Sequence, residues 1–289
     1  MSDTPYIAVV SDMDGTFLQP DHTVSTYTQE VMERLQSTRQ VPFLFATGRH
    51  HVDVFATARK VGLVGYIVTS NGARAHDPQG NVILRQDMDP TIARELACIA
   101  LDSEEITTCV FQEDDWYTDR DTPAITELYQ ENKDVYFPRI FNPRTFASYA
   151  GVYKVYYTST NYTLLAVLEQ QIKDTYGAAV SVAYSLPDCM EVMAAGVNKG
   201  MALAKVLKES IFPNDPRTGE ELLKSCICFG DGENDAQMLM MAGAGCVMEN
   251  AQDRLLCLLP LDTDPHLHRV GSNAENAVAK KLVEVFQLE

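Results

Sequence analysis

The stretch Ser11-Asp12-Met13-Asp14-Gly15-Thr16 decides how the rest of the 289-residue chain is interpreted. It follows the apolar run of residues 6–10, whose length and β-branched content predict a strand. Two carboxylates therefore leave the carboxyl end of a strand, which is where ligands bind in open α/β sheets. We interpret Asp12 as a nucleophile and Asp14 as its acid/base partner. The structural alternative is an acidic turn after an edge strand.

Composition narrows the classes of function. The net charge of −17 gives the chain no general attraction to nucleic acids or anionic membranes. No apolar run approaches the ~18 residues of a membrane-spanning helix, and residues 1–5 do not resemble the start of a signal peptide. The seven cysteines are odd in number and scattered, which is typical of reduced thiols in a cytoplasmic protein. We expect cytoplasmic localisation, no nucleic-acid partner and no membrane partner.

The first third of the chain alternates strands and helices. A helix is predicted from residue 25 or 26 to about residue 37, capped by Ser25 or Thr26, and Thr26 with Gln29 fits a capping box. Strands at residues 41–46 and 66–69 flank a second helix, residues 52–61, that Gly62 ends. Such βαβ units place the carboxyl ends of their strands at one edge of a parallel sheet.

The composition and the pattern of predicted elements change between residues 86 and 190, where aromatic residues are frequent. Helices at 90–101 and 162–176 and alternating strands at 152–159 and 180–184 predict an α+β insert with an antiparallel sheet. We place Lys154 on the polar face of the first of these strands, and we assign Glu191 and Met193 to packing or a position near the hinge. The α/β pattern resumes after residue 195, with strands at 225–229, 246–248 and 268–270 and a C-terminal helix capped by Ser272 or Asn273.

Polar clusters stand at or just beyond the predicted strand ends or at a helix start. Each has a plain alternative: Thr47 can be a cap, Lys199 a surface lysine, and Asp231-Gly232 an ordinary turn. Their joint occurrence at the same edge of one sheet is much less common by chance. The clusters are Asp12/Asp14, Thr47-Gly48-Arg49, Lys199, and Asp231/Asn234/Asp235.

These residue types suit phosphoryl transfer through an aspartyl-phosphate. A carboxylate that attacks phosphorus splits one difficult step into two, and Mg²⁺ with oxygen ligands neutralises the charge. We expect Asp12 and Asp231 to bind Mg²⁺ with their side chains and Asp14 with its carbonyl. Thr47, Lys199 and the N–H groups of residues 13–15 would hold the phosphoryl oxygens. Asp14 would protonate the leaving oxygen and then activate water.

The chain resembles the haloacid dehalogenase (HAD) superfamily of phosphatases. The resemblance rests on four motifs, and their order with the insert is similar to the Cof-type subfamily, which carries a C2 cap. It implies a Rossmann-like core, a parallel sheet flanked by helices, at residues 1–86 and 191–289, and an α+β cap at 87–190. The motifs are Ser11-Asp12-Met13-Asp14-Gly15-Thr16, Ala46-Thr47-Gly48-Arg49, Lys199 in Gly196-Val197-Asn198-Lys199-Gly200, and Gly230-Asp231-Gly232-Glu233-Asn234-Asp235.

Further residues have two interpretations each. Arg49 either contacts substrate, together with Gly48, or braces its loop. Asn71 and Gly72 are candidate substrate contacts, and Asn234 either joins them or positions Lys199 or the Mg²⁺ ligands. Asp235 either bonds to another residue of the site and holds it in place, or is an acidic residue that the helix dipole favours at a helix N-terminus. His50 and His51 are either catalytic or, as is commoner beside a motif, packing residues.

The leading hypothesis is a Mg²⁺-dependent phosphatase for small phosphorylated metabolites. The segments 45–54 and 69–73 resemble bacterial members that act on pyridoxal phosphate and sugar phosphates. The alternatives are a phosphomutase and a non-hydrolytic receiver or phospho-binding module. The insert of about 100 residues and the second acid, Asp14, favour hydrolysis. The physiological substrate, and the choice between monomer and dimer, stay open.

Overall fold

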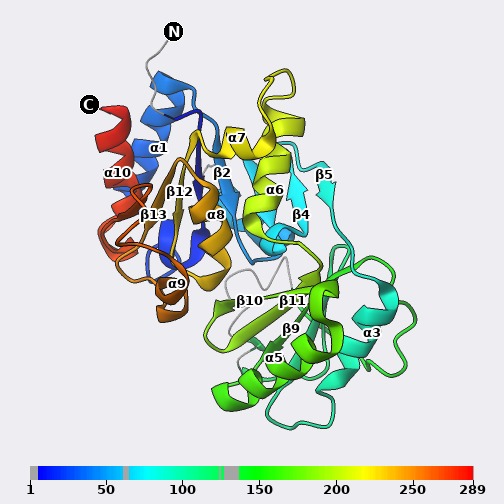
Figure 1. The fold of residues 1–289 in the computed structure, drawn as a ribbon. Coiled ribbons are helices and arrows are strands. Elements are labelled where there is room, and N and C mark those ends of the chain that lie inside the picture. Colours follow the sequence, from blue (N-terminus) through cyan, green and yellow to red (C-terminus); the bar gives the residue numbers. More distant parts are fainter. Residues whose placement is uncertain (1–5, 61–64, 124, 127–136, 289) are drawn as a thin grey trace. The chain divides into compact units, whose positions relative to one another are not determined.

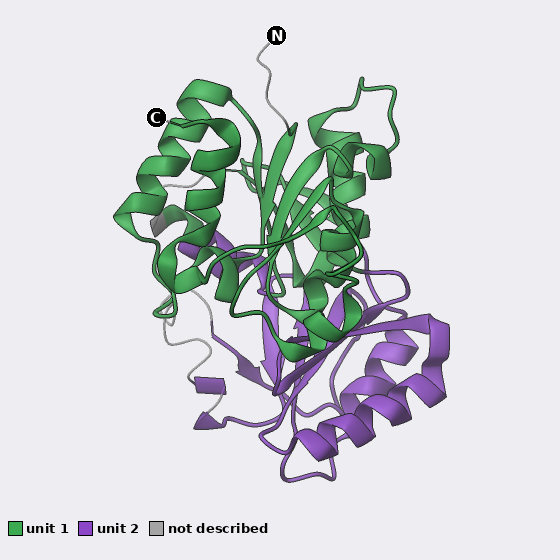
Figure 2. Cartoon of the chain, turned by 60° about the vertical axis from the view of Figure 1, so that its left-hand side comes forward, with its two compact units in different colours: residues 1–48, 58–84, 198–289 green, residues 49–57, 85–197 purple. Residues whose placement is uncertain are grey.

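The computed structural model describes residues 6–60, 65–123, 125–126 and 137–288. The chain divides into two compact units, each continuous in space but not in sequence (Figure 2). Unit 1 comprises Met1–Gly48, Ala58–Leu84 and Asn198–Glu289, and unit 2 comprises Arg49–Thr57 and Arg85–Val197. The predicted end of the second helix at Gly62 lies outside the described residues.

An eight-stranded sheet forms the centre of unit 1, in the order β14-β13-β12-β1-β2-β3-β4-β5 (Figure 1). The strands from β14 to β3 are parallel, and β4 pairs antiparallel with β3. The strands are β1 (Ala8–Ser11), β2 (Phe43–Ala46), β3 (Tyr66–Thr69), β4 (Arg74–His76), β5 (Val82–Arg85), β12 (Cys226–Gly230), β13 (Ala244–Val247) and β14 (Leu267–Arg269).

Helices lie on both faces of this sheet, as parallel strands require for their crossovers. Helices α1 and α10 pack together on one face, whereas α6, α7 and α8 pack on the other (Figure 1). Buried Val10, Leu44 and Val68 of the sheet share a core with Leu203 and Leu239. The helices of unit 1 are α1 (Thr26–Arg39), α6 (Lys199–Val206), α7 (Gly219–Leu223), α8 (Ala236–Met241), α9 (Asp253–Leu258) and α10 (Ala277–Phe286), and most of α2 (His51–Lys60) belongs to unit 2.

The strand order reverses between β1 and β12. From β1 the chain adds β2 and β3 on one side, and from β12 it adds β13 and β14 on the other. Such a switch point leaves a crevice at the carboxyl ends of the two central strands. Since Ser11 is in register with Phe229, the residues that follow β1 and β12, Asp12 and Asp231, are brought close together.

Unit 2 contains a six-stranded, mainly antiparallel sheet in the order β10-β11-β9-β6-β7-β8. Helices α3 (Pro90–Ile99) and α5 (Tyr162–Tyr176) contribute Leu96 and Leu165 to a core that the sheet lines with Val110, Val155 and Val192. The strands are β6 (Thr107–Gln112), β7 (Asp115–Thr118), β8 (Arg139–Ile140), β9 (Val152–Thr158), β10 (Val180–Leu186) and β11 (Cys189–Ala194).

The predicted fold class is confirmed: a parallel α/β core carries an inserted α+β unit with an antiparallel sheet. The expected capping box was wrong: the cap of α1 is Ser25, whose side chain accepts from Thr28 N, so Thr26 and Gln29 form no capping box. Glu191 and Met193 are buried within strand β11, as the predicted packing role requires, although the strand itself was not predicted.

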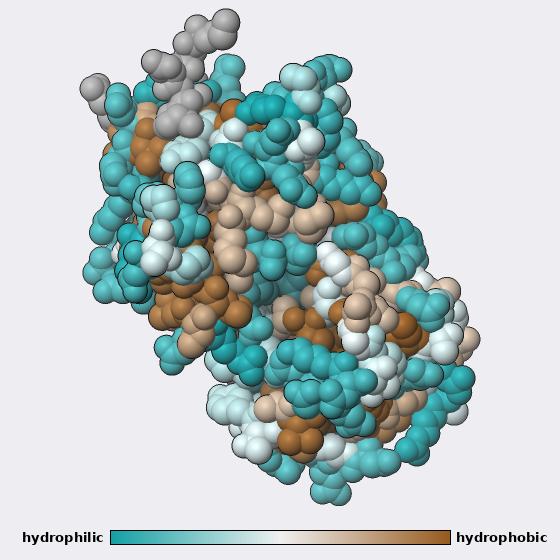
Figure 3. All heavy atoms as spheres, in the orientation of Figure 1, coloured by the Kyte–Doolittle hydropathy of each residue, from teal (hydrophilic) through white to brown (hydrophobic). Residues whose placement is uncertain are grey.

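The visible face of the molecule is mostly hydrophilic, with apolar residues in scattered patches (Figure 3). All seven cysteines are free thiols, and Cys226 and Cys228 are buried in β12. Within the described ranges, no helix combines the length and apolar character needed to cross a membrane.

Lys154 of unit 2 is buried, although we expected it on a polar strand face. It points away from the core shared with α3 and α5 and forms an ion pair with Glu191; the side chains are only 2% and 3% exposed. Its Nζ lies 4.5 Å from the ring centroid of Phe111 and 5.2 Å from that of Tyr156, within the range of cation–π attraction. Each charge of this pair depends on the other, because an isolated buried charge is strongly unfavourable.

We predict that Lys154→Met lowers the free energy of unfolding by about 3–5 kcal/mol, because it breaks a buried ion pair from one side. The double variant Lys154→Met/Glu191→Leu should regain most of that loss, since both buried charges of the pair are removed. Urea unfolding of the wild type, the single variants and the double variant measures this. If the two single variants' losses in the free energy of unfolding add up in the double variant, packing and not the ion pair determines the stability at this position.

Candidate active site

The first motif forms a tight turn after β1. Residues Met13–Phe17 make the turn, and Leu18 N donates to Met13 O at 2.8 Å. Gly15 has φ +71°, a left-handed conformation that glycine adopts without strain. A Cβ at Gly15 would also lie 2.3 Å from Asp231 Oδ2. The alternation of side chains along a strand predicted that Asp12 and Asp14 share one face of an extended strand. The strand ends before Asp12, and Asp14 lies in the turn, so this prediction was wrong.

Two asparagines from distant strand ends hold this turn. Asn250 Nδ2 donates to Gly15 O at 2.7 Å, and Asn273 Nδ2 donates to Leu18 O at 2.9 Å. The two are linked, since Asn273 N donates to Asn250 Oδ1 at 3.0 Å. Neither contact was predicted from the sequence, where Asn273 was considered only as a helix cap, although each residue follows a strand of the parallel sheet by three or four residues. The strand-end rule that identified the four clusters would have found them.

Lys199 is the buried cation of the site. It begins α6, where Asn198 caps the helix by accepting from Met201 N at 2.9 Å. Its Nζ lies 2.7 Å from Asp12 Oδ1 and 2.7 Å from Asp235 Oδ1, and its side chain is fully buried. Burial alone would lower the pKa of Lys199, but the charges of Asp12 and Asp235 outweigh it and raise that pKa above its ordinary value. The lysine therefore remains protonated.

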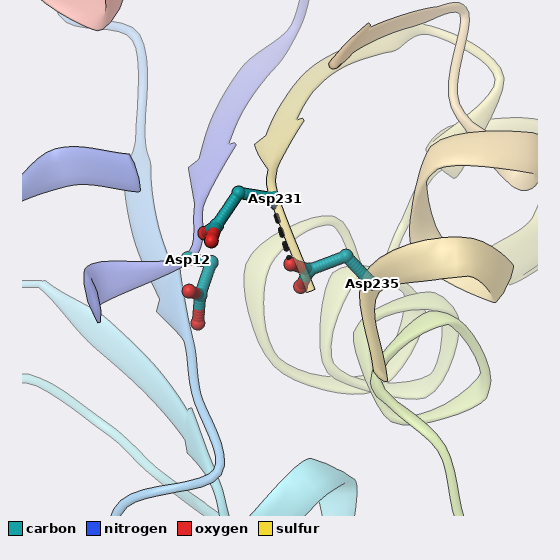
Figure 4. Close-up of side chains that lie close together, drawn as sticks. All are labelled: Asp12, Asp231 and Asp235. Atoms are coloured by element: carbon teal, nitrogen blue, oxygen red, sulfur yellow. Dashed lines mark hydrogen bonds between the residues drawn. The ribbon is translucent and has the colours of Figure 1, made fainter. Parts of the chain in front are cut away.

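Asp235 orients the lysine and the loop after β12. Its Oδ1 accepts from Lys199, and its Oδ2 accepts from Asp231 N at 3.0 Å and Gly232 N at 2.9 Å. Asp231 in turn accepts from Thr16 Oγ1 at 2.6 Å. Figure 4 shows Asp12 beside Asp231 and Asp235, and their ligand oxygens lie within 4.8 Å of one another. Both oxygens of Asp235 thus accept hydrogen bonds within the site.

The carboxylates outnumber the buried cation. Burial raises the pKa of Asp12 well above its ordinary value; Lys199 lowers it, and the neighbouring carboxylates raise it further. Burial, with the charge of Asp235, raises the pKa of Asp231 to about 7. Asp12 and Asp231 each have one oxygen in a described hydrogen bond. Lys199 alone does not balance the negative charge of these closely spaced carboxylates. Carboxylate oxygens are the ligands that a hard divalent cation prefers, so these residues fit Mg²⁺.

Thr47 follows β2 and is linked by hydrogen bonds through Asn71 to Asn234, the residue before Asp235. It is buried, its N–H donates to Val68 O at 2.9 Å, and its carbonyl accepts from Asn71 N at 3.0 Å. Asn71 Oδ1 accepts from Asn234 Nδ2 at 3.0 Å. The structure therefore links predicted residues from the ends of β2, β3 and β12.

Other predicted residues have different neighbours. Arg49 Nη1 lies 2.9 Å from Asp53 Oδ2 at the start of α2, and it falls in unit 2. His50 and His51 stack with ring centroids 4.3 Å apart, and the His50 ring meets Phe111 edge-on. These contacts fit bracing and packing. Asp14, with its side chain 31% exposed, lies 3.1 Å from His22 Nδ1.

Comparison with known proteins identifies the family. A model of haloacid dehalogenase-like hydrolases matches residues 9–282. A putative phosphatase of Haemophilus influenzae is 34% identical over 288 residues, which covers 99% of this chain and 98% of the relative. An HMP-PP phosphatase of Cronobacter sakazakii is 32% identical over 271 residues, covering 94% and 92%.

Solved structures share the fold. A haloacid dehalogenase-like hydrolase of Bacillus subtilis superposes with a TM-score of 0.78 at 21% identity, covering 95% of this chain and 98% of that one. A sugar phosphatase of HAD subclass IIB also gives 0.78, at 18% identity and with 98% and 99% covered. The expected family and the expected class of enzyme, a HAD-type phosphatase, are confirmed. The chain belongs to the haloacid dehalogenase-like hydrolase family.

Proposed function

We propose that the enzyme hydrolyses small phosphorylated metabolites in a Mg²⁺-dependent reaction, through a phosphoryl group carried on Asp12. The observation that carries this proposal is the position of Lys199 Nζ, 2.7 Å from both Asp12 and Asp235, with Asp231 beside them at the neighbouring strand end. A carboxylate nucleophile needs positive charge on both sides of the incoming anion. Lys199 provides one such charge.

In the first step a carboxylate oxygen of Asp12 bonds to phosphorus, the bond to the leaving oxygen breaks, and Asp14 gives that oxygen its proton. In the second step Asp14 takes a proton from water, whose oxygen bonds to phosphorus and releases Asp12 and phosphate. Thr47 and Lys199 hold the phosphoryl oxygens. Asp12, Asp231 and the Asp14 carbonyl would hold Mg²⁺, which would supply the positive charge that lets the two anions approach.

We infer the substrate class from the names of similar proteins and from the net charge of the chain. One relative is named an HMP-PP phosphatase and one structural neighbour a sugar phosphatase. We propose sugar phosphates or pyridoxal phosphate as substrates of this chain, contacted by Gly48, Arg49 and Gly72 and selected by the cap at residues 87–190. The net charge of −17 supports a small metabolite in preference to nucleic acid or a membrane surface, and free thiols support a cytoplasmic location.

We predict that the wild type hydrolyses an aryl phosphate only with Mg²⁺ and that Asp12→Asn abolishes turnover, because the amide is not a nucleophile. Asp14→Asn should slow turnover by about 10²–10⁴-fold, the usual contribution of general acid–base catalysis. Initial rates with and without Mg²⁺ measure both effects. Metal-independent hydrolysis, or an Asp12→Asn variant with wild-type rates, would refute the proposal.

We predict that Mg²⁺ stabilises the protein more as pH rises. The pKa of Asp231 is raised to about 7, so between its ordinary pKa and pH 7 the folded state holds more protons than the unfolded one. The contribution of Asp231 to metal-free stability therefore falls as pH rises through about 7. Because Mg²⁺ needs the deprotonated ligand, its thermal shift should grow from about pH 5.5 to about pH 8. A pH-independent shift, or one retained in Asp231→Asn, would contradict this.

Gly15 provides a steric test of the Asp231 position. Gly15→Ala should reduce activity at least tenfold, since its Cβ would lie 2.3 Å from Asp231 Oδ2 and a shift of ~1 Å at a catalytic group can cost 10²-fold. The matched control is Gly177→Ala, which also has a left-handed φ, +50°, but open space around the added carbon. The control should lose some stability and keep its rate. Equal rates in both variants would refute the prediction.

A further inference from the structure

The turn after β3 has a costly conformation. Ser70, Asn71 and Gly72 are consecutive left-handed residues with φ of +50°, +56° and +102°. Serine rarely adopts this region. All three residues are buried, and among the described residues Thr69 Oγ1 and Ser70 Oγ find no hydrogen-bond partner. Strained backbone and unsatisfied buried hydroxyls persist only where the surroundings fix them, and they gather at functional sites.

The surroundings of this turn are segments that carry predicted catalytic residues. Asn71 N donates to Thr47 O at 3.0 Å, and Asn71 Oδ1 accepts from Asn234 Nδ2 at 3.0 Å. On its other side Gly72 packs so closely that an added Cβ would lie 2.5 Å from Asn198 O. The turn thus contacts Thr47 itself, the residue before Lys199 and the residue before Asp235.

We propose that the Ser70–Gly72 turn is a clamp, and that Asn71 and Asn234 are positioning residues joined by their side-chain hydrogen bond. This rests on the proposed function, since the clamp acts on Thr47, Lys199 and Asp235. The bond fixes Asn234, and through its neighbour Asp235 it fixes the two oxygens that hold Lys199 and the Asp231-Gly232 backbone. The Asn71 N–H fixes Thr47 at the same time. The two asparagines thereby hold the groups that bind phosphoryl oxygens in one arrangement.

A positioning role has a kinetic signature that a substrate contact lacks. A group that only binds the substrate changes KM, whereas misplacement of the catalytic groups lowers kcat. Asn71→Gly removes the side chain and tolerates φ +56°, and Asn234→Ala removes the other partner. Each should lower kcat for an aryl phosphate by about 10- to 100-fold, with KM nearly unchanged. The double variant should be no slower than the slower single variant, because both remove the same bond.

Asn276 supplies the matched control. It is another left-handed asparagine, with φ +58°, and its Oδ1 accepts from Ser25 Oγ at 2.7 Å and Thr28 Oγ1 at 3.3 Å. Asn276→Gly should lower the midpoint of thermal unfolding and leave kcat unchanged.

The outcomes separate this proposal from the function on which it rests. Wild-type kcat in Asn71→Gly and Asn234→Ala, raised KM at constant kcat, or losses that multiply in the double variant would each overturn the clamp and leave hydrolysis standing. An inactive wild type would overturn the proposed function and the clamp's role with it. If Asn71→Gly fails to fold, Asn234→Ala decides by its kcat alone.

Discussion

The site depends on the balance of charge around Lys199. Three carboxylates, Asp12, Asp231 and Asp235, meet one buried ammonium group, which leaves two formal negative charges when all are ionised. Water cannot reach these groups freely, so burial raises the pKa of Asp12 and Asp231. Lys199 removes part of this penalty by bonding to Asp12 and Asp235 at once. The remaining deficit is the physical reason to expect a divalent cation.

The sheet topology creates this concentration of charge. A parallel sheet whose strand order reverses between β1 and β12 brings two loop starts together at one edge. Asp12 and Asp231 are the first residues of those loops, and Gly15 lets the first loop turn within contact of the second. Residues more than 200 positions apart in sequence, such as Thr16 and Asp231, thereby share a hydrogen bond. The fold thus supplies the proximity, and each short motif supplies the chemistry.

Sequence patterns predicted the features that depend on residues close together in the sequence. Strand β3 and helix α5 were placed correctly; Asp12, Thr47 and Asp231 were identified because they follow strands, and Lys199 because it begins a helix. Strand β9 shows why unit 2 was harder: every one of its residues is buried, so Lys154 could not be told from a surface lysine by alternation. The Asn71–Asn234 bond joins residues 163 positions apart, and no local pattern specifies such a contact. Asn250 and Asn273 could be recognised as polar residues that follow strands, but their contacts with the first turn, more than 200 positions away in sequence, could not.

In the proposed reaction Asp12 carries the phosphoryl group, which can be detected directly. The most direct measurement is peptide mass spectrometry after acid quench of Asp14→Asn mixed with Mg²⁺ and an aryl phosphate, whose good leaving group needs little protonation. Loss of the general base slows release of the intermediate. We predict an added mass of one phosphoryl group on Asp12, absent from the double variant Asp12→Asn/Asp14→Asn. Phosphate release with no covalent adduct, or an adduct on another residue, would contradict it.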